Sequence, residues 1–134
     1  MEITDDIGRL DFAAITALLS GAYWGAGRTD EMHRRAFANS LCAIALVDGR
    51  QVGFARAITD RALFARISDV IVWPDHRGNG IGKALVEALL GHPELATVST
   101  WLLNTADAHG LYERYGFRPA VDGNEMRLDR AGAG

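Results

Sequence analysis

The stretch Asp75-His76-Arg77-Gly78-Asn79-Gly80-Ile81-Gly82-Lys83 decides the fold of this chain. It follows the apolar run 70–72, which Pro74 ends, and it leads into residues with helical periodicity. Three alternating glycines at a strand-to-helix turn leave backbone N–H groups uncovered at the positive end of a helix. Arg77 and Lys83 add positive charge. The turn therefore predicts a cradle for an anion, most of all a phosphate or pyrophosphate.

Two other phosphate-binding loops do not fit this stretch. A dinucleotide-binding fingerprint, G-x-G-x-x-G, needs glycine where Lys83 stands. A Walker A loop needs glycine at Arg77 and serine or threonine at Ala84. A tight turn without a ligand is the remaining alternative, although three glycines beside Arg and Lys exceed what a turn needs.

Hydrophobic periodicity on both sides of the turn predicts an α/β protein, a mixed sheet covered by helices. Helices are expected at about 11–21, 29–39, 80–90 and 106–115, and strands at 41–47, 51–59, 63–73, 97–103, 117–119 and 125–128, with an optional strand at 2–4. Gly53, Ala55 and Ala57 give one strand an all-small face. Close packing near a ligand cleft and a plain helix contact explain this face equally well.

Composition narrows the function further. The chain has 134 residues, 49% of them apolar, which predicts one domain over 1–130 and a loose tail over 131–134. The net charge of −3 disfavours a nucleic-acid partner. The chain has no apolar run long enough to span a membrane and begins with an acidic segment unlike a signal peptide, so we expect a cytoplasmic protein.

The metal-binding residue types do not form a recognisable site. The lone Cys42 cannot form an internal disulfide or a cysteine-based metal site, and we expect it in the core. His33, His76 and His92 lack metal-ligand spacing, so no metal is assigned.

Two motifs together resemble the GCN5-related N-acetyltransferase (GNAT) family. Residues 77–82 fit the family signature R/Q-x-x-G-x-G/A, and residues 108–117, AHGLYERYGF, resemble its A-x-x-L-Y-E-x-x-G-F helix. The close resemblance covers about 69–119. One position departs from the pattern: seven residues before Tyr112 the family often carries Asn, whereas this chain has Thr105, with Asn104 beside it.

The resemblance implies the GNAT acyl-CoA N-acyltransferase fold, in which two parallel strands of a mixed sheet splay apart and acetyl-CoA enters between them. It implies that the backbone of Ile71, Val72 and Trp73 pairs with the pantetheine arm. The pyrophosphate would lie on Arg77, Gly78, Asn79, Gly80, Ile81, Gly82 and Lys83. Asn104, Thr105 and His109 are further candidates for contact with the cofactor, although a histidine placed like His109 is more often a half-exposed helix residue.

The resemblance also implies transfer of acetyl from acetyl-CoA to a primary amine by direct attack. Tyr112 matches the family's usual proton donor to the departing thiolate, and a core tyrosine is the alternative. Asp69 is a candidate base, because partial desolvation on its strand raises a carboxyl pKa. The alternatives are that Asp69 only hydrogen-bonds neighbouring backbone, or that a chain of waters carries the proton without a single base. Asp60 is expected to be a turn residue.

The family usually builds its acceptor site from the first two helices and their connection, where this chain has Tyr23, Trp24 and Arg28. Arg28 could recognise a carboxylate or phosphate, whereas the aromatics could simply roof the core. A small-molecule or peptide amine is the expected acceptor. An acyl-CoA sensor without turnover and an acetyltransferase acting on a protein partner are the alternatives. A monomer and a homodimer fit the sequence equally.

Overall fold

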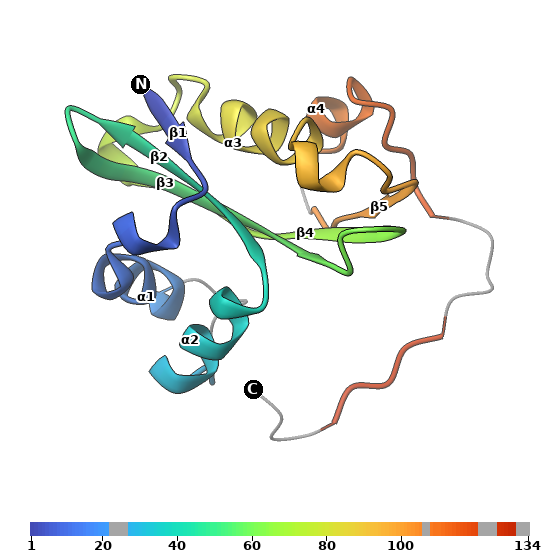
Figure 1. Ribbon diagram of the computed structural model, residues 1–134, viewed down its shortest axis with the longest axis horizontal. Helices are drawn as coiled ribbons and strands as arrows, with labels where there is room; N and C mark the ends of the chain where they lie inside the picture. Colours follow the sequence, from blue (N-terminus) through green and yellow to red (C-terminus); the bar gives the residue numbers. More distant parts are fainter. Residues whose placement is uncertain (22–26, 106–107, 121–125, 131–134) are drawn as a thin grey trace. The chain divides into compact units, whose positions relative to one another are not determined.

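The protein is described here by a computed structural model covering residues 1–21, 27–105, 108–120 and 126–130, with only the backbone of 20 and 21 (Figure 1). The chain divides into two compact units, Met1–Leu103 and Asn104–Gly134. The expected tail at 131–134 lies outside the described residues.

The first unit is built on a five-stranded sheet with the strand order β1-β2-β3-β4-β5. Its strands are β1 (Glu2–Thr4), β2 (Leu41–Val47), β3 (Arg50–Thr59), β4 (Phe64–Val72) and β5 (Thr100–Leu102). β1 to β4 are antiparallel, and β4 and β5 run parallel, which confirms the predicted mixed sheet. Asp48 and Gly49 both have positive φ, 51° and 76°, as a two-residue hairpin between β2 and β3 requires.

Helices cover both faces of this sheet (Figure 1). α1 (Phe12–Gly21) and α2 (Asp30–Ala38) lie on one face, and α3 (Ile81–Leu90) lies on the other. Asp11 and Thr29 cap the first two helices: Asp11 Oδ1 accepts the N–H of Ala14 at 3.2 Å, and Thr29 Oγ1 accepts that of Met32 at 3.2 Å. Short 3₁₀ turns lie at Ile7–Arg9, Pro74–His76 and Pro93–Leu95.

The main core lies between the sheet and the first two helices. Its buried members include Ile15, Leu19, Phe37, Ile44 and Phe54. Cys42 belongs to the same cluster, which confirms it as a core residue, and burial raises the pKa of its thiol to about 11.

The all-small face of β3 is explained by α3. A Cβ added at Gly53 would lie 2.8 Å from Ile81 Cγ2 and 3.0 Å from Leu85 Cδ1. Of the two explanations offered by the sequence, the helix contact is therefore the one found at Gly53, because only glycine lets α3 approach β3 this closely.

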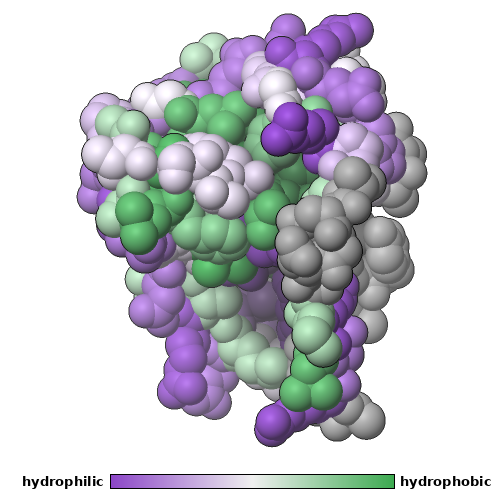
Figure 2. All heavy atoms as spheres, turned by 90° about the vertical axis from the view of Figure 1, so that its right-hand side faces the viewer, coloured by the Kyte–Doolittle hydropathy of each residue, from purple (hydrophilic) through white to green (hydrophobic). Residues whose placement is uncertain are grey.

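The turn from β3 to β4 is organised by Asp60. Its Oδ1 accepts the N–H groups of Ala62, Leu63 and Phe64 at 2.9, 2.8 and 3.1 Å, which confirms Asp60 as a turn residue. Leu63 and Phe64 are exposed there. The face drawn in Figure 2 carries both hydrophobic and hydrophilic residues.

Several predicted elements are shorter or absent. β5 covers only Thr100–Leu102, and the last helix, α4, covers only His109–Glu113. Residues 117–119 and 126–128 form no strand, so the two final strands predicted from the sequence are wrong in the described part of the chain. An extended apolar pattern becomes a strand only when a neighbour supplies hydrogen bonds. Leu128 is exposed, and Pro119 has no N–H to donate.

Candidate active site

Among the described residues of the first unit, the edge of β4 that faces β5 has a strand partner over only part of its length. β5 pairs with β4 only at Phe64–Arg66, whereas β4 continues to Val72. Two parallel strands that pair at one end and then part leave backbone groups available to an extended ligand. All three residues of β5 pair with β4, so the predicted splay of the two parallel strands stays a prediction.

Among the three residues expected to pair with the pantetheine arm, Val72 has the suitable backbone. Trp73 donates its N–H to Val52 O on β3 at 2.8 Å, and its carbonyl accepts the His76 N–H at 2.9 Å. Because backbone groups alternate in direction along a strand, Val72 faces the open edge while Ile71 and Trp73 face β3. The side chain of Trp73 packs against the core, which favours a packing role for it.

The glycine-rich turn forms the predicted cradle geometry. Gly78 and Gly80 have φ of 82° and 75°, and α3 starts directly after Gly80 with no side chain capping it. Its first helical bond runs from the Ala84 N–H to Gly80 O at 3.0 Å. The N–H groups of residues 81–83 precede that bond and are left for a ligand.

The three glycines are not equivalent. A Cβ at Gly78 or Gly80 would meet no atom within 4 Å, so both border open space, and both have left-handed backbone. A Cβ at Gly82 would make an ordinary 3.6 Å contact with Val72 Cγ2, and its φ is not positive. Only the first two positions require glycine for backbone conformation.

Side chains around the cradle leave it electrically positive. Arg77 and Lys83 are exposed. Arg77 Nε donates to Val72 O at 3.3 Å, so this guanidinium links the open edge of β4 to the cradle. Asn79 Nδ2 donates to His76 O at 3.3 Å, which closes the loop on itself.

Asp69 lies in an irregularity of β4. The register between β3 and β4 shifts here, since Phe54 pairs with Ile71 but Arg56 pairs with Ser68. Asp69 has φ of 54°, a conformation that Asp tolerates better than most residues. Its side chain is fully buried, and both oxygens are occupied: Arg28 Nη1 donates to Oδ1 at 2.9 Å and Arg56 Nε to Oδ2 at 2.7 Å.

The expected raised pKa of Asp69 is wrong. Burial alone raises the pKa of this carboxyl, but the hydrogen bonds and charges of Arg56 and Arg28 outweigh burial and hold the pKa below its ordinary value. A carboxylate with two guanidinium partners is a weak proton acceptor. Arg28 likewise differs from expectation, because its guanidinium is already partly used by Asp69.

Two more polar side chains complete what we call the Asp69 cluster: Asp69, Arg28, Arg56, Ser40 and His33. Arg56 Nη1 donates to Ser40 Oγ at 3.0 Å. His33, on α2, is 2% exposed and stacks on Phe37 with ring centroids 5.7 Å apart. Neither of its ring nitrogens has a hydrogen-bond partner within the described part of the chain. Burial and the charge of Arg28 lower the pKa of His33, so the ring is neutral at pH 7.

The second unit holds the remaining predicted residues. Tyr112, on α4, is half-buried rather than a fully buried core residue, and its ring meets Phe117 edge-on with centroids 6.0 Å apart. His109 is exposed on the same helix. Thr105 Oγ1 accepts the Ala108 N–H at 3.0 Å, so its hydroxyl caps the turn before α4, and Asn104 is exposed.

The sequence predicts only part of the expected acceptor site. Tyr23 and Trp24 lie outside the described residues. It missed Arg56 and the buried position of His33. The available signals were an arginine between Phe54 and Ile58 on an otherwise apolar strand face, and the spacing of four that places His33 and Phe37 on one side of a helix.

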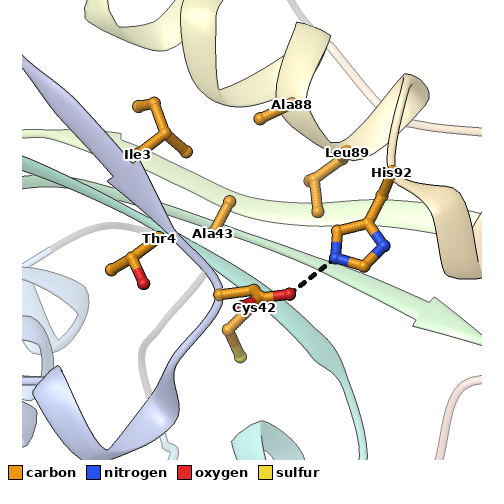
Figure 3. A pocket seen from close by; sticks show the side chains of 8 residues that line it. Ile3, Thr4, Cys42, Ala43, Ala88, Leu89 and His92 are labelled. Carbon is orange, nitrogen blue, oxygen red and sulfur yellow. Dashed lines mark hydrogen bonds and ion pairs between the residues drawn. The ribbon is translucent and has the colours of Figure 1, made fainter.

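A cavity of about 300 Å³ lies at the other end of α3 from the cradle (Figure 3). It is bordered by Ala88 and His92, and His92 Nε2 lies 2.7 Å from Asp5 Oδ2. Asp5, His92 and Glu94 have the spacing of a metal site. However, His92 Nδ1 accepts the Glu94 N–H at 3.1 Å, so the neutral ring carries its proton on Nε2 and has no lone pair left for a metal. We therefore assign this group a structural role.

No helix in the described part of the chain is long and apolar enough to cross a membrane.

Comparisons with known proteins agree with this geometry. The model of the acetyltransferase (GNAT) domain matches residues 38–119. A crystal structure from Xanthomonas campestris pv. campestris, described as an acetyltransferase of the GNAT family, superposes with a TM-score of 0.92 at 42% identity, covering 98% of this chain and 94% of that one. A Deinococcus radiodurans structure, also described as an acetyltransferase, gives a TM-score of 0.70 at 27% identity, covering 96% and 87% of the two chains.

Curated relatives are longer. The uncharacterized N-acetyltransferase ycf52 of Pyropia yezoensis is 35% identical over 94 residues, which cover 66% of this chain and 54% of the relative. The chain thus spans about half the length of this relative. The family model matches more than half of the chain and the Xanthomonas structure superposes over nearly all of it, so the chain belongs to the GNAT family of acetyltransferases.

Proposed function

We propose that this protein is an acetyl-CoA-dependent N-acetyltransferase that transfers the acetyl group to a primary amine by direct attack. The observation that carries the proposal is the open edge of β4 leading into the uncapped N-terminus of α3. This arrangement suits a ligand with an extended arm and a pyrophosphate at its end. Family membership supplies the class of reaction.

In the proposed complex the cradle residues 78–83 and Arg77 hold the pyrophosphate, and Val72 pairs with the pantetheine arm. Arg77 would have to share its donors between Val72 O and phosphate, which a guanidinium with five N–H groups can do. The remaining proposed neighbours of the cofactor are Ile71, Trp73, Asn104, Thr105 and His109. Those of their polar groups that already form hydrogen bonds within the protein are not proposed to bond the cofactor.

The transfer forms a C–N bond and breaks the thioester C–S bond. The amine nitrogen loses a proton and the departing thiolate gains one. We assign protonation of the departing thiolate to Tyr112, because this residue occupies the tyrosine position of the second family motif. A phenol stays protonated at neutral pH and can donate to a sulfur anion.

The proton acceptor for the amine is a separate question. Asp69 was the sequence-based candidate, and both of its oxygens are held by arginines. We therefore propose that Asp69 positions the acceptor side of the site and that water carries the amine proton away. Tyr23, Trp24 and Arg28 are proposed to line that acceptor side, and a small amine or peptide end is the proposed acceptor.

One experiment separates this enzyme from an acyl-CoA sensor. Acetyl-CoA is titrated by calorimetry, and amines are screened for release of free thiol in the same samples. Amine-dependent release is expected in the wild type, and in Tyr112→Phe the turnover should fall about 100-fold or more with acetyl-CoA binding kept. Binding without release for any amine would favour the sensor. Absence of binding would contradict the cradle.

A further inference from the structure

The Asp69 cluster carries more positive charge than its own carboxylate can neutralise. Two guanidiniums, Arg28 and Arg56, share the single carboxylate of Asp69, and His33 is neutral. Arg56 donates hydrogen bonds from two nitrogens, one to Asp69 and one to Ser40, whereas Arg28 donates from one nitrogen, to Asp69. The side chain of Arg28 is 22% exposed, and within the described part of the chain it donates only to Asp69.

His33 supplies an independent sign that a ligand is missing from this cluster. A neutral imidazole has one N–H donor and one acceptor nitrogen, and neither is paired here within the described residues. Native proteins rarely leave a buried polar group unpaired, because losing its hydrogen bonds to water is unfavourable. The His33 ring stacks on Phe37 with centroids 5.7 Å apart, and Arg56 Cζ lies 6.0 Å from the centroid of the same Phe37 ring, which places His33 beside the cluster.

The position of the cluster suits the acceptor rather than the cofactor. Asp69 precedes Val72 by three residues on β4, roughly 10 Å along the strand and away from the cradle. Arg28 reaches Asp69 from the connection between α1 and α2, and His33 lies on α2, the helix that follows. A pantetheine arm that runs from the cradle along β4 points its thioester toward this part of the strand.

We propose that the acceptor amine also carries an anionic group, a carboxylate or a phosphate, which Arg28 and His33 bind. This inference rests on the proposed acetyltransferase function. An oxyanion accepts hydrogen bonds from the spare N–H groups of Arg28 and from the His33 ring, and it balances the excess positive charge. An amine without an anionic group leaves Arg28 and His33 without a hydrogen-bond acceptor and leaves the excess positive charge unbalanced. A polyamine is repelled by the guanidiniums.

The test compares matched amines by kcat/KM for thiol release from acetyl-CoA. The pairs are β-alanine with propylamine, tyrosine with tyramine, and phosphoethanolamine with ethanolamine, with spermidine as the polyamine. The anionic member of at least one pair should be preferred roughly 10- to 100-fold, about 1.4–2.8 kcal/mol. Preference in the phosphoethanolamine pair alone would assign the anion as phosphate, and preference in the first two pairs alone would assign it as carboxylate.

Variants locate the preference. Arg28→Gln and His33→Phe should each reduce the preference for the anionic amine at least several-fold through KM, with acetyl-CoA binding unchanged. His33→Phe keeps the stack on Phe37 and removes the unpaired nitrogens, so it should fold at least as stably as the wild type. Arg35→Gln, an exposed arginine on the same helix, is the matched control and should keep the preference.

Equal kcat/KM for the two members of every pair, or a preference that survives both Arg28→Gln and His33→Phe, would overturn this inference while leaving the acetyltransferase intact. A preference for spermidine would overturn it as well. Failure of the wild type to bind acetyl-CoA would instead overturn the proposed function.

Discussion

Asp69 shows how one side chain joins three separate segments. Its carboxylate ties β4 to Arg56 on β3 and to Arg28 on the connection between α1 and α2. A carboxylate that is buried with two guanidiniums stabilises the fold only while it is charged, since its removal leaves two cations in a poorly solvated place. The cluster is therefore a structural joint as well as a candidate binding site.

Asp69→Asn should lower the free energy of unfolding at pH 7 by about 3 kcal/mol. The folded pKa of Asp69 lies below its ordinary value of 3.8, so its stabilisation is present above that pH and disappears as the pH falls through the folded pKa. The gap between wild type and variant should thus shrink below about pH 3.8. Urea unfolding at a series of pH values measures it.

Glu31→Gln is the control for this measurement, since Glu31 is exposed on α2 and is in no ion pair in the described part of the chain. It should change stability by no more than about 0.5 kcal/mol. A gap between wild type and Asp69→Asn that stays constant down to pH 2 would show that the charge of Asp69 is not what stabilises the fold.

The sequence indicates Asp69 as a candidate site residue but predicts the wrong direction for its pKa shift. The strand pattern shows that the residue faces the core, and burial alone raises a carboxyl pKa. Arg56 and Arg28 lie 13 and 41 residues from Asp69 in the sequence, and this spacing does not indicate a contact.

Among the described elements, the turn from β4 into α3 is the one that we propose to bind an anion through its backbone. Gly80 ends the turn in the left-handed region and borders open space, whereas Gly82 has neither property. Gly80→Ala should therefore raise the Kd for acetyl-CoA by about tenfold, or about 1.4 kcal/mol, because strained backbone shifts the N–H groups of the cradle.

Gly82→Ala is the matched control and should leave the Kd within about twofold, as its Cβ fits at an ordinary contact distance. Calorimetry on both variants makes the comparison. An equal loss in the two variants would mean that side-chain bulk, and not backbone conformation, decides binding.

The contact between β3 and α3 depends on Gly53. A methyl group there would press on Ile81 and Leu85 at distances that real Cβ atoms hardly ever show. Gly53→Ala should destabilise the protein by about 1–3 kcal/mol in thermal or urea unfolding. Gly110→Ala, where a Cβ meets open space on α4, should be neutral or slightly stabilising. Unchanged stability of Gly53→Ala would show that α3 can move away from the sheet without loss.

For the whole molecule, acetyl-CoA should stabilise the fold by mass action, because an unfolded chain has no cradle. At a concentration about 100-fold above Kd the gain is about 2.7 kcal/mol, which corresponds to a Tm several degrees higher. Acetyl-pantetheine, which lacks the pyrophosphate, should give little or no shift at the same concentration. Equal shifts from the two compounds would place the main binding energy on β4 and away from the cradle.

The chain alone determined the elements with strong periodicity and a local punctuation signal. β2, the Asp48-Gly49 turn, α1 with its cap at Asp11 and the glycine turn into α3 were all predicted, because each depends on neighbouring residues. The two motifs at 77–82 and 108–117 also sufficed to indicate the family, because the first is a local backbone device.

Tertiary structure decided what depends on partners distant in the chain. The strands expected at 117–119 and 126–128 did not form, since a strand exists only with a neighbour to pair with. The identity of α3 as the element that packs on Gly53, the joining of Arg28 and Arg56 on Asp69, and the burial of His33 likewise cannot be seen in the local sequence pattern. Each is a matter of packing, and packing brings together residues that hydrophobic periodicity and spacing leave unrelated.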